Sequence, residues 1–148
     1  MFDTMNDYLP AFDLCVMRFE GTVTMPVIRA AMRARRAKAT FNVSQPVLVD
    51  WRQTLRLDVS FLEAGQITHF IERDADQGAL KRHYVFLYTN PDLLGDLRLI
   101  QSRMSSNPAL TVDLVETVEA AAACLGMPDL TEAHLRLETP VPPLSLAT

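Results

Sequence analysis

The chain alternates between short apolar runs typical of strands and longer segments whose apolar residues recur at helical spacing. The clearest run is 46–52, where a proline and three aliphatic residues lead into an Asp-Trp-Arg end. A continuous apolar run bounded by turn residues is typical of a strand that is covered on both faces. We therefore expect this run to form the central strand of a sheet.

The same alternation continues along the whole chain and predicts an α/β fold with a largely parallel sheet. Strands are expected at 12–20, 46–52, 83–89 and 110–115, with a further short strand around 2–5. Helices are expected at 24–38, 58–73, 91–105 and 117–125, with one more turn at 131–135. The alternating pattern at 110–115 places that strand at a sheet edge.

Local signals set the expected ends of these elements. Gly21 is predicted to end the first long strand and Gly126 the last long helix, because glycine adopts turn conformations at little cost. Thr24 and Thr117 are expected N-caps, and Asp58 or Ser60 is expected to cap the helix at 58–73. Residues 53–57 are expected to cross from the central strand to that helix.

The predicted helix at 58–73 is apolar on more than one side. One stripe comprises Phe61, Ala64, Thr68 and Ile71, with Ile67 at its edge. Leu62 and Phe70 lie off that stripe. Such a helix is more deeply covered than a surface helix, by its own domain or by a second subunit.

Composition bounds the function classes. The 148 residues fit one domain, and a net charge of −4 argues against general nucleic-acid binding, for which a basic domain is expected. No apolar run reaches the length of a membrane span, and the first residues lack a signal-peptide pattern. Cys15 and Cys124 are too few for a disulfide framework or a zinc site, so we expect two buried thiols in a reducing cytoplasm.

Four blocks of the chain share their order and spacing with a known superfamily. They are the strand and glycine at 12–24, the central strand at 47–52, the strand and helix at 84–104, and the closing strand and helix at 112–126. Gly95 and Arg98 form a G-x-x-R pattern in the third block, and the fourth ends in Cys-Leu-Gly. The chain resembles the STAS and SpoIIAA-like superfamily, in particular the small bacterial SpoIIAA-like domains. The resemblance implies a domain at 1–127, followed by a proline-rich tail at 128–148.

That resemblance implies a mixed, largely parallel sheet of four or five strands with helices packed mainly on one face. It also implies an adaptor module rather than an enzyme, switched in the best-known members by phosphorylation of a serine beyond the central strand. Ser60 is the approximate match, although Phe61 stands where a small residue would admit a kinase. An ordinary place in the first turn of the helix is the alternative for Ser60. A related fold group carries lipid ligands.

Polar residues follow two neighbouring strands of the predicted sheet. In open α/β sheets, ligands bind beyond the carboxyl ends of the strands. The candidate ligand or partner site there comprises Asp50, Trp51, Arg52, Asn90, Asp92 and Arg98. Asp50 is a candidate general base. Otherwise it caps a turn or pairs with Arg52 or Arg98, while Trp51 covers the edge of the core.

A basic face is predicted on the helix at 24–38. Arg29, Arg33 and Arg36 recur at helical spacing, joined by Arg35 and Lys38. This face is either simply solvated or a docking patch for an acidic partner.

No sequence motif for a cofactor, a metal or catalysis is present, and the three histidines are isolated. We therefore expect a non-enzymatic adaptor or regulatory module that acts through protein contacts, as a homodimer. The alternative is a binder of a small apolar or lipid-like ligand beside the central strand. An enzyme that uses Asp50 is the least favoured of the three hypotheses.

Overall fold

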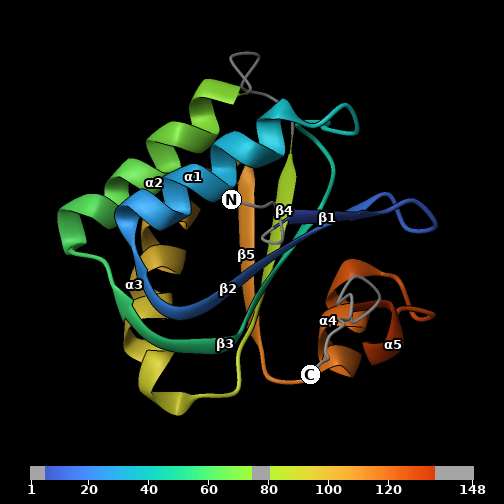
Figure 1. Cartoon of the computed structure of the whole chain (residues 1–148). Helices are drawn as coiled ribbons and strands as arrows, with labels where there is room; N and C mark the ends of the chain where they lie inside the picture. The colour runs from blue at the N-terminus through green and yellow to red at the C-terminus, as the bar shows by residue number, and fades with distance from the viewer. Residues whose placement is uncertain (1–5, 75–80, 136–148) are drawn as a thin grey trace, which may run out of the picture.

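The sheet has five strands in the order in which they occur in the chain (Figure 1). The computed structural model describes residues 6–74 and 81–135, with side chains for 6–69 and 81–135. The strands are β1 (Asn6–Leu9), β2 (Leu14–Thr24), β3 (Val47–Asp58), β4 (Arg82–Leu87) and β5 (Leu110–Val115). β1 is antiparallel to β2, and every other neighbouring pair is parallel, so the predicted mixed α/β fold is confirmed.

The central strand is β3, as the apolar run at 46–52 predicts. It pairs with β2 on one side and β4 on the other, and the residues from Val47 to Trp51 are buried. β5 lies at one edge of the sheet and β1 at the other. The expected strand around 2–5 lies outside the described residues.

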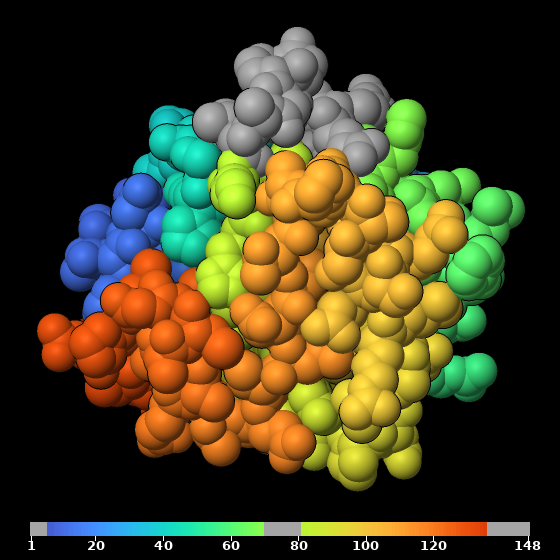
Figure 2. All heavy atoms as spheres, turned by 180° about the vertical axis from the view of Figure 1, so that it is seen from behind, coloured from blue at the N-terminus to red at the C-terminus, as the bar shows by residue number. Residues whose placement is uncertain are grey.

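Helices cover both faces of the sheet. They are α1 (Met25–Ala37), α2 (Phe61–Asp74), the 3-10 turn η1 (Pro91–Leu93), α3 (Leu94–Ser105), α4 (Val118–Leu125) and α5 (Glu132–Leu135). α1, α2 and α3 lie against one face, and the shorter α4 and α5 lie against the other (Figure 1). From behind, the orange and red residues of α4 and α5 form a ridge beside the yellow-green residues of β4 (Figure 2).

The alternation of side chains along each strand divides the hydrophobic core between these two faces. Val49, Trp51 and Phe86 belong to the core beneath α1, α2 and α3. Leu48 and Val85 belong to the core beneath α4 and α5. The long helices therefore cover the larger of two separate cores.

The chain after residue 127 takes part in the second core. Leu130 and Leu135 are buried there, with exposed fractions of 3% and 2%. The packed part of the molecule thus extends past the expected end of the domain at residue 127, at least to Leu135.

Two expected strand ends are wrong, and both errors have one cause. β2 does not end at Gly21 but runs to Thr24, and β3 does not end at Arg52 but runs to Asp58. The two strands continue to pair with each other beyond the last β4 partner, as far as the pair of Thr24 and Asp58. Gly21, with φ of 69°, sits beside a shift in register, so the glycine marks a bulge within the strand.

The ends of the helices agree more closely with the sequence. Thr117 caps α4, since its hydroxyl oxygen accepts a hydrogen bond from Ala120 N at 3.0 Å, and Gly126 ends it in the left-handed conformation. Thr24 precedes α1 but makes no side-chain cap. Cys15 is buried as expected, whereas Cys124 is exposed, because it lies on the outer side of the short helix α4.

Candidate functional site

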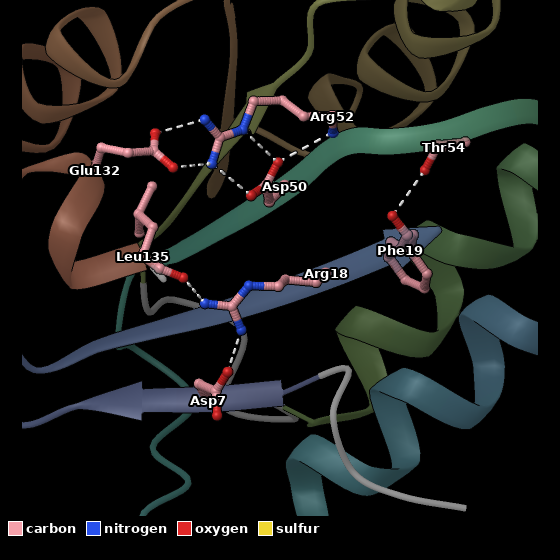
Figure 3. Close-up of polar contacts among 8 residues, drawn as sticks. All are labelled: Asp7, Arg18, Phe19, Asp50, Arg52, Thr54, Glu132 and Leu135. Atoms are coloured by element: carbon pink, nitrogen blue, oxygen red, sulfur yellow. Dashed lines mark hydrogen bonds and ion pairs between the residues drawn. The ribbon is translucent and has the colours of Figure 1, made fainter. Parts of the chain in front are cut away.

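A guanidinium group bridges two carboxylates where the sheet meets α5 (Figure 3). Arg52 donates from Nε to Asp50 Oδ1 and from Nη2 to Asp50 Oδ2, each at 2.9 Å. Its Nη1 lies 2.6 Å from Glu132 Oε1. Paired donors in this planar fork match a carboxylate well, so the arrangement fixes both partners.

A second arginine forms a parallel bridge on the same face. Arg18 donates to the carboxylate of Asp7 on β1 and to the backbone carbonyl of Leu135 (Figure 3). Arg18 on β2 is also the register partner of Asp50 on β3. Together the two bridges tie three strands to the C-terminal segment.

Asp50 is engaged as an acceptor in this arrangement. It is buried, its two oxygens accept the Arg52 guanidinium, and Oδ1 also accepts Arg52 N at 3.0 Å. The hydrogen bond to Asp50 is the main reason that the pKa of Arg52 lies above its ordinary value. Burial alone would lower this pKa, and the hydrogen bond to Glu132 also raises it. The pairing of Asp50 with Arg52 was one of the predicted roles, and its geometry is that of a structural ion pair.

The other predicted site residues do not join this pair. Trp51 points to the opposite face and packs on Phe19, with ring centroids 4.9 Å apart. Asn90 caps η1 by accepting from Asp92 N at 3.0 Å, and both Asp92 and Arg98 are exposed. The six residues therefore do not converge on one site.

Tyr88 lies near the end of β4, close to two charged side chains. Its hydroxyl donates to Glu116 Oε2 at 3.2 Å. Burial and then Glu116 raise the pKa of Tyr88 above its ordinary value, while Arg98 lowers it.

Ser60 is the N-cap of α2. Its hydroxyl oxygen accepts from Glu63 N at 3.1 Å, and Glu63 Oε1 accepts from Ser60 N at 3.0 Å. This reciprocal pair is a capping box. The cap role that the sequence allowed for Ser60 is present, and its phosphorylation stays a prediction.

Three large apolar side chains are exposed where β3 passes into α2. Leu55, Phe61 and Leu62 have exposed fractions of 75%, 61% and 72%. Phe61 was predicted to face the core, but the stripe that does so comprises Ala64, Ile67 and Thr68. The helix starts three residues later than expected, after the longer β3, so Phe61 lies on its open first turn.

Arg103 on α3 holds the Phe61 ring in place from one side. Its guanidinium carbon lies 4.6 Å from the centre of the ring, a cation–π contact. The same side chain passes over Gly65, where any Cβ would collide with Nη2. The rest of the Phe61 ring is open to solvent.

Part of the predicted basic face is buried in the folded chain. Arg33 is exposed and Arg29 and Arg36 are half-buried, so these three remain candidates for docking. Arg35 instead turns inward and is buried, with an exposed fraction of 6%. The spacing of the arginines predicts Arg35 on the basic face, although it also follows the buried Ile28 and Ala31 at helical spacing.

Within residues 6–74 and 81–135, no three His, Cys, Asp or Glu side chains are grouped so that they could hold a metal ion. No helix in the described part of the chain is long and apolar enough to cross a membrane. No family model matches the sequence, and comparisons with curated proteins and with solved structures give no match.

Proposed function

We propose that this chain is a non-enzymatic protein-interaction module of SpoIIAA-like fold, which associates with a second copy of itself through residues 55–62. The observation that carries the proposal is the exposure of Leu55, Phe61 and Leu62. These three side chains lie within one eight-residue stretch, which we take as the centre of the contact, because grouped apolar side chains mark interaction sites more often than single ones do. The capping box and Arg103 hold this stretch in a defined shape.

The charges around these side chains suit a symmetric contact. Arg56 and Asp58 lie between Leu55 and Phe61 in the chain, and both are exposed. In a two-fold contact each copy presents the same surface, so Arg56 of one copy can face Asp58 of the other. Opposite charges beside an apolar centre favour association of two copies over a wrong partner.

Sedimentation velocity of the full chain tests this proposal. We expect the wild-type protein to be a dimer and Leu62→Glu to be a monomer, because two added carboxylates would then be buried against each other. Phe61 is left unchanged in this variant, so its contact with Arg103 remains. Ala123→Glu is the matched control, since it adds the same charge at an exposed position of α4.

The control is expected to remain a dimer with an unchanged circular dichroism spectrum. A wild-type protein that is monomeric at every concentration, or a Leu62→Glu variant that is still a dimer, would contradict self-association through this stretch.

A further inference from the structure

A small cavity lies between the sheet and the three long helices. Its volume is about 40 Å³, which is room for about three water molecules. Most of the lining is apolar and is formed by Met17, Phe19, Met32, Trp51, Phe86 and Met104. Methionine side chains are flexible, so this cavity can adapt its shape to a ligand. Met32 is only half-buried and leads from the cavity toward the surface of α1.

Arg35 lines the same cavity. Its Nη2 donates to Asn42 O at 3.2 Å and to Gln45 Oε1 at 3.3 Å, and its carbon lies 4.8 Å from the centre of the Phe41 ring. The Cys15 thiol is a further hydrogen-bonded neighbour of Arg35, and burial raises the pKa of this thiol above its ordinary value. All of these partners are neutral, and no described carboxylate forms an ion pair with Arg35. A buried cation without a counter-charge is unfavourable, because burial removes the water that stabilises it.

Two residues that line the cavity each carry a buried N–H donor that lacks an acceptor among the described residues. These donors are Nε of Arg35 and Nε1 of Trp51. The exposed fractions of the two residues are 6% and 3%, so bulk water does not serve as the acceptor. An unpaired buried donor costs about 1–3 kcal/mol, which favours any acceptor that enters the cavity.

We propose that this cavity binds a small molecule with an apolar body and a carboxylate. The carboxylate supplies the missing negative charge to Arg35 and accepts its Nε–H. The apolar body packs among the methionines and against the stacked rings of Phe19 and Trp51. A neutral amphiphile would leave the buried charge uncompensated, so the site discriminates by charge as well as by shape.

Trp51 gives a direct reading of binding, since it is the only tryptophan of the chain. We would titrate the full-length protein with butyrate, hexanoate and benzoate, and with 1-hexanol and hexylammonium as neutral and cationic counterparts of hexanoate. Straight-chain and aromatic carboxylates share the recognised group, and comparing them shows which body the cavity accepts. We expect a saturable change in Trp51 emission with at least one carboxylate, at least tenfold tighter than with 1-hexanol, and none with hexylammonium.

Two variants separate recognition from folding. Arg35→Met removes the cation and keeps an apolar stem, so it is expected to bring the affinities for hexanoate and 1-hexanol within about twofold of each other. Val49→Ile keeps Arg35 and places one more methylene in the cavity wall, so it is expected to weaken carboxylate binding at least tenfold without unfolding the protein. This second variant keeps the test valid if Arg35→Met does not fold.

The absence of a saturable change with every carboxylate would overturn the proposal and leave ordered water as the occupant of the cavity. Equal affinity for hexanoate and 1-hexanol in the wild-type protein would overturn the role of Arg35. Both outcomes are independent of the dimer, whose test does not involve the cavity.

Discussion

Arg52 and Arg35 lie on opposite faces of the same sheet and differ in how their charges are compensated. Arg52 is held between Asp50 and Glu132, two carboxylates of its own chain. Arg35 is more deeply buried, yet its hydrogen-bond partners are two neutral oxygens and the Cys15 thiol. A buried charge that is neutralised by carboxylates of its own chain stabilises the fold. A buried charge without a counter-charge is available to a ligand of opposite charge.

The two faces of the sheet also differ in whether their polar groups are paired. On the side of α4 and α5, the bridges made by Arg52 and Arg18 tie the C-terminal segment down and seal the smaller core. On the side of α1, α2 and α3 lie the cavity with its unpaired donors and the exposed apolar side chains at the start of α2. We therefore assign binding to this second side and structural closure to the first.

Arg52→Met should have the largest effect on stability. It leaves the carboxylate of Asp50 buried without a partner, and losing one member of such a pair costs about 3 kcal/mol. Urea denaturation of wild type and variant measures the difference in the free energy of unfolding. A loss well below 1 kcal/mol would show that the Arg52 bridge is not what holds this face together.

Arg35→Met should have a clearly smaller effect on stability when no ligand is present. This variant leaves no buried carboxylate behind, and removing an uncompensated cation offsets the loss of two hydrogen bonds, so the free energy of unfolding should stay within about 1 kcal/mol of wild type. The same urea experiment measures it. A loss as large as that of Arg52→Met would mean that the two arginines play equivalent structural roles.

Glu132→Gln should have the smallest effect of the three. The Glu132 side chain is 35% exposed, so its ion pair with Arg52 is worth only about 0.5 kcal/mol. Asp50 keeps its guanidinium partner in this variant, and the midpoint of urea denaturation should move only slightly. A shift equal to that of Arg52→Met would place the main stabilisation in α5 rather than in the pair of Asp50 and Arg52.

The sequence predicted the alternating architecture and the central strand because those depend on local patterns of apolar residues. It did not predict the length of β3, since residues 53–58 mix polar and apolar types and become a strand only by pairing with β2. The split of Asp50 and Trp51 between opposite faces follows from the period of two in a strand and was open to prediction. The contact of Glu132 with Arg52 was not, because no local pattern marks a partner eighty residues away.

The sequence contains a signal that sets Arg35 apart from the other arginines of its helix. Arginines at helical spacing usually indicate a solvated face, and three of the four in this helix fit that pattern. The fourth lies on the buried stripe that includes Ile28 and Ala31. A charged residue on an apolar stripe is the signal that distinguishes it.

The indole N–H of Trp51 gives the most direct test of the central claim, that the side of α1, α2 and α3 holds an incomplete anion site. A ¹H–¹⁵N NMR spectrum of the full chain contains one indole signal, which can be followed while hexanoate is added. We predict a saturable shift in the wild-type protein, together with a shift of the Arg35 Nε–H signal, and neither shift with 1-hexanol at the same concentrations. Signals that stay in place with every carboxylate would contradict the claim.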